Sequence, residues 1–506
     1  MKQCCPSGYS KVLGYGVLLI PAVLYFSLAL FSEKVSFGSD QDGYLVALSA
    51  LKISHNESYE PSRLPGFPLF ERLIAHIVSP TDARTSKAIV ALCSLLVLAL
   101  LLTLMLQAGG CKTVVPLVIL YFGLLPINIQ SSFMVMDYSC SLVLILLSSL
   151  LLSICPAVKI RYVCFVAFFA GLALALAVGV RLTAILFLPA AVLTIVIDRR
   201  QTLRLRIISL LCFVVSASVF ILFYIPVINL YGIHFLSGYP GYFSVSSWIK
   251  AQGSLVLALF GGVFGLLALI SLLYVALRNM QSQKFMIVWK EQLWGIRVLF
   301  LFAIFNSVFY LRHPYEPAYH LPLLAFLAIL LAIGLREKDR RFLWAGIVVL
   351  AFCSIVVLKP ASRSILAIVP GRVISELECQ KKDRCLYDSI SGILNENNKM
   401  LLLGSPAAER IPTWFFDRLQ TIDKPIHPNC RTVWGKATGY PNPVYQIGSV
   451  ILADKVLLMT KDNTVRLENL LNIKGVHDIV LVASPGEDLF NVPGGFATCN
   501  IKWLKY

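Results

Sequence analysis

The sequence predicts a polytopic α-helical membrane protein with a smaller polar domain at its C-terminal end. Of its 506 residues, 58% are hydrophobic and 14% are charged, whereas soluble globular proteins average about 45–50% apolar and about 25% charged residues. The mean hydropathy is +0.77, and the apolar residues gather in stretches of about 20, the length that crosses a bilayer. These observations exclude a soluble enzyme and a disordered chain.

Apolar stretches follow one another from residue 12 to residue 358. A helix crosses the hydrocarbon core with about 20 mostly apolar residues, so about eleven spans are predicted. They lie at 12–32, 88–107, 112–128, 138–156, 162–180, 182–197, 207–228, 255–277, 295–311, 319–335 and 342–358. The first stretch is not a cleaved signal peptide, because no small-residue cleavage site follows it and further spans do.

The basic residues between the spans predict the orientation of the chain, whose formal net charge is +17. With the N-terminus inside, the connections on its side carry sixteen Lys and Arg residues, against nine in the longer connections opposite. The positive-inside rule then predicts a cytoplasmic N-terminus and, with an odd number of spans, an external C-terminus. No basic run is interleaved with aromatic residues, so nucleic acid is not an expected partner.

The composition changes after residue 358. Residues 359–506 hold 18 Lys and Arg and 14 Asp and Glu residues, and no apolar stretch of spanning length. Short apolar runs near residues 400, 450 and 480 alternate with polar stretches that could form helices, a pattern typical of a small α/β domain. We therefore predict a transmembrane domain over 1–358 and a soluble extracytoplasmic α/β domain over 359–506.

Four cysteines lie in this predicted external domain: Cys379, Cys385, Cys430 and Cys499. An even number in an oxidising compartment predicts two disulfides, and four cysteines allow three pairings. The spacing contains no pair typical of a zinc site. The remaining nine cysteines lie in the N-terminal tail or in the spans, where they are interpreted as small apolar residues.

The first outer loop, residues 33–87, predicts two short helices at the membrane surface. Apolar residues from Tyr44 to Leu51 recur at helical spacing after Asp42, and a second such stretch follows Pro68. Between them, residues 63–68 (Arg-Leu-Pro-Gly-Phe-Pro) predict a rigid turn. Together these elements would form the wall of a cavity above the bilayer.

Carboxylates are scarce between the spans, and two of them lie at predicted outer helix ends. Asp40 follows the first span, and Asp137 is the only charged residue between Lys112 and Lys159. Either could simply cap a helix N-terminus. An ionisable residue bounded by long apolar runs is, however, a candidate functional residue.

Cations and a polar loop complete the predicted outer face. Arg63, Arg181 and Arg312 are candidates to bind a lipid-linked phosphate, because guanidinium groups match phosphate geometry. The loop after Arg312 adds Glu316, Tyr319 and His320 as candidate substrate contacts. A divalent metal is left open there, since His313, Glu316 and His320 match no established zinc spacing. No cofactor is otherwise implied.

Acids that activate a nucleophile, together with cations that stabilise a phosphate leaving group, are the groups needed for glycosyl transfer from a lipid phosphate sugar. The spans themselves hold almost no ionisable residues, which disfavours a proton or ion relay through the membrane. The sequence therefore favours transferase chemistry on the outer face.

Five motifs in order resemble the GT-C fold membrane glycosyltransferases, especially bacterial aminoarabinose transferases and protein O-mannosyltransferases. They are Asp-x-x-x-Tyr at Asp40–Tyr44, the turn at 63–68, Asp137 as a second acid, a Gly-rich segment from 171 that ends in Arg181, and Tyr-x-Leu-Pro at Tyr319–Pro322. The resemblance covers roughly residues 12–335. Members of the family often carry Asp-Glu at the first motif, whereas Gln41 follows Asp40 here.

The resemblance implies an inverting transferase that uses a polyprenyl-phosphate sugar as its donor. Asp40 would orient or deprotonate the acceptor hydroxyl, with Asp42 as the alternative base, and Asp137 would support it or bind the acceptor. Tyr44 would join Glu316, Tyr319 and His320 as a contact to the acceptor or substrate. Expected partners are the lipid-linked donor, membrane lipids and a glycan, lipid or protein acceptor.

Other functions and locations stay open at this point. A transporter or flippase for a lipid-linked glycan would show inverted repeats and broken helices with polar groups at mid-membrane, and a polysaccharide polymerase or ligase would use a diphosphate donor. The external cysteines favour a bacterial inner membrane and a periplasmic C-terminal domain, with the endoplasmic reticulum membrane as the alternative. Lipopolysaccharide, lipid-linked O-antigen or another surface glycan is the favoured acceptor class.

Overall fold

The structure is a computed structural model that describes most of residues 16–416 and the strands that follow. The described residues are 16, 19–56, 59–62, 65–198, 201–232, 245–280, 294–312, 317–359, 367–394, 399–403, 410–416, 419–421, 445–447, 450–453, 478–483 and 500–505.

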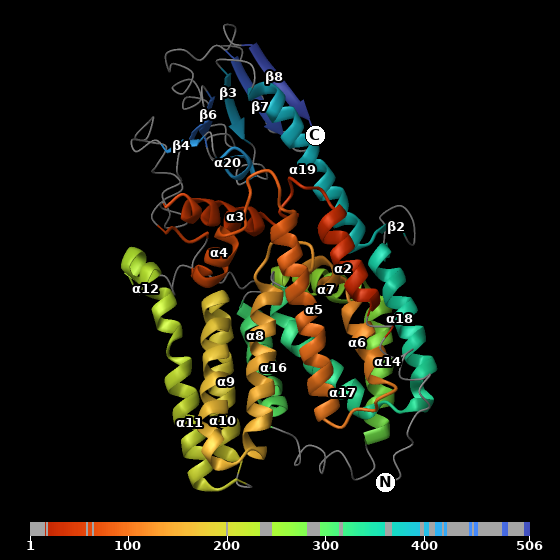
Figure 1. The fold of residues 1–506 in the computed structure, drawn as a ribbon. Helices are drawn as coiled ribbons and strands as arrows, with labels where there is room; N and C mark the ends of the chain where they lie inside the picture. Colours follow the sequence, from red (N-terminus) through yellow and green to blue (C-terminus); the bar gives the residue numbers. More distant parts are fainter. Residues whose placement is uncertain are drawn as a thin grey trace.

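Apolar helices run side by side in an elongated bundle (Figure 1). They are α2 (Leu19–Phe31), α5 (Arg84–Gln107), α6 (Val115–Gly123), α8 (Tyr138–Ile154), α9 (Ile160–Val180), α10 (Phe187–Ile197), α11 (Leu203–Ala217), α12 (Phe220–Tyr231), α14 (Val263–Met280), α16 (Trp294–Arg312), α17 (Leu321–Gly334) and α18 (Arg340–Ile355). Short 3-10 turns η1 (Cys155–Ala157), η2 (Leu182–Leu186), η4 (Pro317–His320) and η5 (Glu337–Asp339) connect some of them.

Six helical segments in the described part of the chain are long and apolar enough to cross a membrane. They are Arg84–Gln107, Tyr138–Ala157, Ile160–Val180, Leu203–Tyr231, Val263–Met280 and Pro317–Gly334. Shorter apolar helices lie at Leu19–Phe31, Leu182–Ile197 and Trp294–Tyr310. The chain is therefore a multi-pass α-helical membrane protein, as its composition predicts.

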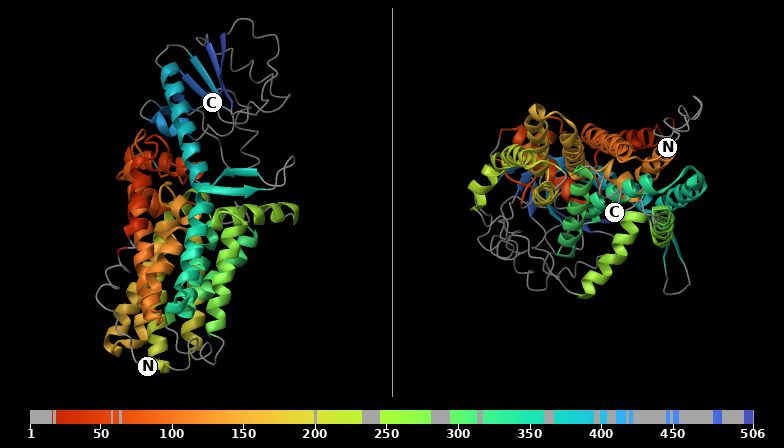
Figure 2. Two further views of the ribbon diagram at one scale, coloured as in Figure 1. Left: turned by 90° about the vertical axis from the view of Figure 1, so that its right-hand side faces the viewer. Right: turned by 90° about the horizontal axis from the view of Figure 1, so that it is seen from below.

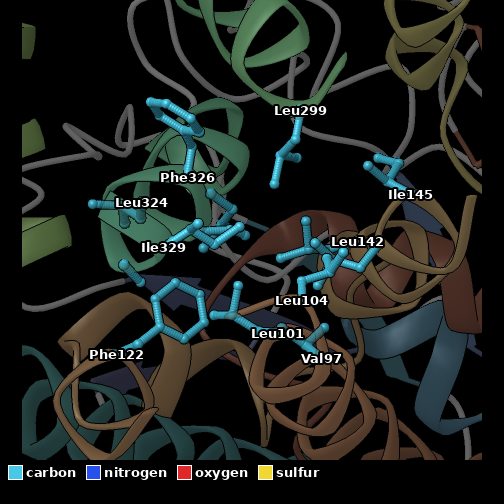
Figure 3. Packing of buried hydrophobic residues seen from close by; sticks show 14 of the residues in the cluster. Val97, Leu101, Leu104, Phe122, Leu142, Ile145, Leu299, Leu324, Phe326 and Ile329 are labelled. Atoms are coloured by element: carbon cyan, nitrogen blue, oxygen red, sulfur yellow. The ribbon is translucent and has the colours of Figure 1, made fainter. Parts of the chain in front are cut away.

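The bundle is held together by apolar side chains from several helices. Figure 3 shows residues of α5, α6, α8, α16 and α17 that point toward one another, including Leu101, Phe122, Leu142, Leu299 and Phe326. All of them are nearly or fully buried. Large apolar residues on the outside of the helices, such as Phe165 and Val215, are exposed, as expected for surfaces that face lipid.

Several predicted spans differ from the observed helices at their ends or in their middle. The stretch 207–228 is divided between α11, which ends at Ala217, and α12, which begins at Phe220. The stretch 112–128 is broken, because α6 ends at Gly123 and Pro126 begins α7 (Pro126–Ser131); proline cannot continue a helix but is well placed at its first turn. The stretch 342–358 stops being helical at Ile355 and continues as a strand.

The stretch 255–277 is divided at Gly261 and Gly262 into α13 (Val245–Phe260) and α14. Both glycines have positive φ, +70° and +118°, and a Cβ on Gly261 would lie 2.5 Å from the carbonyl oxygen of Cys353. Only glycine adopts this backbone conformation at so close an approach without strain. In Figure 2, α13 lies across the direction of α14.

Two helices of the 33–87 loop, α3 (Gln41–Ser54) and α4 (Pro68–Ala75), lie across one end of the bundle (Figure 1). Both occur where the sequence predicts helices. This end, called here the α3–α4 end, also receives the loop between α7 and α8.

The C-terminal region rises from the same end (Figure 1). A hairpin of β1 (Val356–Lys359) and β2 (Ala367–Pro370) leads into α19 (Arg372–Leu394), and a short α20 (Arg410–Trp414) follows β3. A six-stranded sheet has the order β4-β5-β6-β3-β7-β8, with its β6-β3-β7-β8 part parallel. The strands are β3 (Lys399–Leu403), β4 (Leu419–Thr421), β5 (Tyr445–Ile447), β6 (Val450–Ala453), β7 (Asp478–Ala483) and β8 (Asn500–Lys505).

Candidate functional site

A buried ion pair joins the start of α8 to the end of α9. Asp137 immediately precedes α8, and Arg181 follows α9 in an extended conformation. The Nη1 of Arg181 donates to both carboxylate oxygens of Asp137, at 2.9 Å to Oδ2 and 3.1 Å to Oδ1. Asp137 is 1% exposed and Arg181 8%. Two charges withdrawn from water in this way depend strongly on each other.

Two tyrosine rings flank the guanidinium of Arg181. Its Cζ lies 4.7 Å from the ring centroid of Tyr138 and 5.0 Å from that of Tyr319. A cation over an aromatic face is attracted by the ring quadrupole. The guanidinium is therefore oriented by Asp137 together with the tyrosines of α8 and η4. Arg181 and Tyr319, both candidate site residues in the sequence, are thus in contact.

A small cavity of about 30 Å³ opens beside these side chains. Arg181, Tyr138 and Tyr319 line it together with the polar residues Ser141, Thr183 and Asn306. A volume of this size holds about one or two water molecules. The cavity therefore has room for a small polar group beside the guanidinium.

His320 lies next to Tyr319 at the start of α17 but points into the protein. It is buried, and its ring packs edge-on against Tyr310 with the centroids 4.3 Å apart. Its Nε2 atom has no hydrogen-bond partner among the described residues. Arg312 ends α16 nearby in the sequence, whereas Arg63 and Glu316 lie outside the described residues, as does His313.

Asp40 is the N-cap of α3, the role that any helix-starting aspartate can fill. Its Oδ1 accepts a hydrogen bond from the backbone N–H of Asp42 at 3.0 Å, and the residue is half-buried. Asp42 lies in the first turn of the same helix.

The segments that carry Asp40 and Asp137 lie against each other. The backbone N–H of Val135 donates to the carbonyl of Phe37 at 2.9 Å. A Cβ on Gly38, which has φ +125°, would lie 3.0 Å from the side chain of Met134. Two acids that are 97 positions apart in the numbering are thus carried by neighbouring loops at the α3–α4 end.

Tyr44, an expected substrate contact, does not line the cavity. It is fully buried, and its hydroxyl donates to Oδ2 of Asp383 at 2.7 Å. Burial raises the pKa of this tyrosine well above its usual range. Its position in the Asp-x-x-x-Tyr motif therefore serves the contact between α3 and α19 rather than a surface open to substrate.

The polar face of α19 is not among the sites predicted from the sequence, although the spacing of its polar residues indicates a helix face. Glu376, Gln380 and Asp383 recur at intervals of four and three residues, which puts them on one helix face. All three are buried against the 33–87 loop and α5. Asp383 also forms an ion pair with Arg410 of α20, at 2.7 Å. Burial raises the pKa of Asp383, and the guanidinium opposes that rise.

The metal site and the disulfides that the sequence left open lie only partly within the described residues. The described part of the chain contains no group of three or more His, Cys, Asp and Glu residues placed to hold a metal ion. Cys379 is a free thiol, and Cys430 and Cys499 lie outside the described residues. The external disulfides stay a prediction.

Comparison with known proteins finds likeness in structure only. No protein-family model matches the chain, and no curated protein matches its sequence. Among solved structures, it is similar to ArnT from Cupriavidus metallidurans bound to undecaprenyl phosphate, with a TM-score of 0.49 and 15% identity. That match covers 68% of this chain and 63% of that one. ArnT in the apo state gives a TM-score of 0.48 and 16% identity over the same shares.

The chain is also similar to the oligosaccharyltransferase of Archaeoglobus fulgidus in its apo form. The TM-score is 0.45 with 12% identity, over 81% of this chain and 64% of that one. These likenesses concern the fold of the two neighbours alone. This chain spans less than two thirds of each, and TM-scores below 0.5 assign it neither an activity nor a residue role.

Proposed function

We propose that this protein is a membrane glycosyltransferase that moves a sugar from a polyprenyl-phosphate donor to an acceptor. The observation that carries the proposal is the buried Arg181, held by Asp137 and two tyrosines beside a cavity. A guanidinium fixed in advance at such a place stabilises charge that develops on a leaving phosphate.

The proposed reaction is a single in-line displacement. The acceptor oxygen forms a bond to the anomeric carbon of the sugar, and the bond from that carbon to the phosphate oxygen breaks. The acceptor proton passes to the carboxylate of Asp40, and polyprenyl phosphate leaves with the electron pair. Displacement from the opposite side inverts the anomeric configuration. Asp42, two residues along, is the alternative base.

The other predicted residues take supporting roles in this proposal. Arg63 and Arg312 would join Arg181 at the donor phosphate, and Tyr319 and His320 would contact substrate together with Glu316. Tyr44 and His320 are both buried in this structure, so the substrate contacts expected of them would require these side chains to become exposed. Asp137 orients Arg181 and restores charge balance to the buried site. The reaction needs no redox cofactor.

We further propose that the chain crosses the membrane about eleven times, with its N-terminus in the cytoplasm and residues 359–506 as an external α/β domain. The basic connections support this orientation. With the transfer on the outer face, the favoured setting is a bacterial inner membrane and a lipopolysaccharide or other surface glycan, lipid or protein as the acceptor.

The direct test uses purified protein with a labelled polyprenyl-phosphate sugar and a lipid extract of the host membrane as the acceptor source. We expect release of free polyprenyl phosphate, and a fall in its rate of about 10²-fold or more in Asp40→Asn, the range typical of a lost general base. The matched control is Asp82→Asn, because Asp82 lies in the same loop and its side chain is 36% exposed.

The outcomes separate the candidate functions. A flippase moves the donor without releasing lipid phosphate, so the absence of release with active transport would contradict the transferase. Full activity in Asp40→Asn together with loss of activity in Asp42→Asn would identify Asp42 as the base. Full activity in both variants would refute the mechanism.

A further inference from the structure

We propose that Glu376 of α19 is a positioning residue for Asp40, so that the C-terminal region controls the geometry of the proposed base. This inference rests on the proposed function for its catalytic consequence. Its structural part stands on hydrogen bonds between α19 and the residue that precedes Asp40.

The carboxylate of Glu376 binds Ser39 at two points. The backbone N–H of Ser39 donates to Oε1 at 2.8 Å, and the Ser39 hydroxyl donates to Oε2. Glu376 is 2% exposed, so water does not compete for these bonds. Because Ser39 is the neighbour of Asp40, this contact restrains the backbone from which the Asp40 side chain projects.

The same carboxylate reaches the element that leads to Asp137. Gln130 of α7 donates from Nε2 to Oε2 of Glu376 at 2.9 Å, and Gln380 donates to Oε1 at 3.0 Å. Four donors therefore converge on one buried side chain. Since α7 leads into the loop before Asp137, Glu376 ties both acid-bearing segments to one helix of the C-terminal region.

A second contact point lies two turns farther along α19. Asp383 accepts hydrogen bonds from Ser36 at 2.5 Å and from Tyr44 at 2.7 Å. One partner precedes Asp40 and the other follows it on α3. Asp40 is thus bracketed on both sides by bonds to α19, and Lys87 of α5 joins the same face through Gln380 at 2.9 Å.

A carboxamide cannot replace this carboxylate, although its shape is nearly the same. Both oxygens of Glu376 accept hydrogen bonds, whereas glutamine offers one acceptor oxygen and an NH₂ donor. In Glu376→Gln, the new NH₂ group would replace one acceptor oxygen, so the N–H donor of either Ser39 or Gln130 would face another donor. Misplacement of a reacting group by about 1 Å can lower turnover by about 10²-fold.

The experiment compares Glu376→Gln with Glu378→Gln in the full-length protein. Glu378 lies on the same helix and is exposed, so it controls for the chemistry of the substitution. We expect Glu376→Gln to lower kcat by about 10- to 100-fold while the donor KM stays within about two-fold. Hydrogen exchange at the Ser39 amide should become faster, and Glu378→Gln should change neither quantity.

Ser39→Ala is the second variant in case Glu376→Gln does not fold. It removes only the hydroxyl donor and keeps the backbone bond, so we expect a smaller fall in kcat. If Glu376→Gln does not fold, an unchanged kcat in Ser39→Ala overturns the proposal. If it folds, the double variant should lose much less than the sum of the two single losses, because both changes remove the same contact. Additive effects would then overturn the proposal.

The two readouts separate this inference from the proposed function. If the wild type releases no polyprenyl phosphate, the proposed function and the catalytic role fail together, and hydrogen exchange alone decides whether Glu376 holds the loop. If the wild type is active, a Glu376→Gln protein with unchanged kcat overturns the positioning role. So does a loss confined to KM, or unchanged exchange at Ser39.

Discussion

At the scale of single residues, Arg181 and Asp137 are the pair on which the candidate site depends. The carboxylate is almost completely buried and forms its ion pair with this guanidinium. Removing one member of such a pair leaves the other charge buried without compensation. This is more damaging than the small net contribution of the intact pair would suggest.

The prediction for this pair compares Arg181→Ala with Arg181→Lys. The alanine variant should lose about 3–5 kcal/mol of stability, because the buried Asp137 side chain loses its ion-pair partner. The lysine variant keeps the positive charge but loses the planar guanidinium and its stacking on Tyr138 and Tyr319. It should therefore still fold, but its affinity for the donor should be lower. Thermal unfolding in detergent and the donor KM measure the two effects.

Arg161 provides the control, because it also lies over a tyrosine ring, 4.7 Å from the centroid of Tyr162, but is exposed. Arg161→Lys and Arg161→Ala should leave the unfolding temperature and the donor KM nearly unchanged. Equal effects at Arg161 and Arg181 would show that the buried pair has no special importance.

Glu71 on α4 makes a prediction about pH. It is completely buried and accepts hydrogen bonds from Tyr59 at 2.6 Å and from the backbone of Ser62 at 2.9 Å. Burial raises its pKa above the usual value, although these bonds oppose the rise. The folded state therefore favours the protonated form of Glu71. The stability gained in this way is fully present below the unfolded-state pKa of about 4.3. It is lost as the pH rises through the higher folded-state pKa.

We expect wild-type stability to fall relative to that of Glu71→Gln as the pH rises above about 4.3. Unfolding temperatures of the two proteins, measured side by side between mildly acidic and neutral pH, give this difference directly. A difference that stays constant, or that grows in favour of the wild type, would contradict a raised pKa.

At the scale of elements, close approach between helices decides the packing of the bundle. A Cβ on Gly171 of α9 would collide with the Ser216 hydroxyl and with the carbonyl of Phe213, both on α11. Small residues at such crossings let helices pack backbone against backbone in a membrane. Gly171 is therefore a packing residue, apart from its place in the Gly-rich segment of the motif series.

Gly171→Ala should force α9 and α11 apart and destabilise the protein by about 1–3 kcal/mol, the usual cost of overpacking. Gly253→Ala is the control, because Gly253 is an exposed helical glycine and a Cβ there would meet no atom within 4 Å. That variant should be neutral or slightly stabilised, since alanine is the better helix former. Thermal unfolding in detergent distinguishes the two, and equal effects would contradict the packing role.

At the scale of the whole molecule, the distribution of charge predicts which side each part occupies. Alkaline phosphatase is active only after export, because its disulfides form in an oxidising compartment. A fusion after Tyr506 should be active, and a fusion after Lys338, in the basic connection before α18, should be inactive. Activity in the reverse order would place the proposed site on the cytoplasmic side and remove the basis for an outer-leaflet donor.

Much of the architecture follows from local pattern. The spans, the α3 and α4 helices, and the importance of Asp137 and Arg181 are all predicted from runs of apolar residues and from the rarity of charge among them. These features depend on neighbours within one or two helical turns. The helix breaks at Pro126 and Gly261–Gly262 also have local causes, but a prediction from the length and hydropathy of apolar stretches does not detect them.

The sequence by itself therefore determined that this is a multi-pass membrane protein, where most of its apolar helices lie and which rare charges are the candidate functional residues. Only the tertiary structure decided how those charges are paired. Asp137 meets Arg181 across 44 positions and Tyr44 meets Asp383 across 339. Hydrophobic periodicity specifies which face of a helix is buried, but not which distant polar group it faces. A buried charge must find a partner, and the packing of the helices determines which partner is within reach.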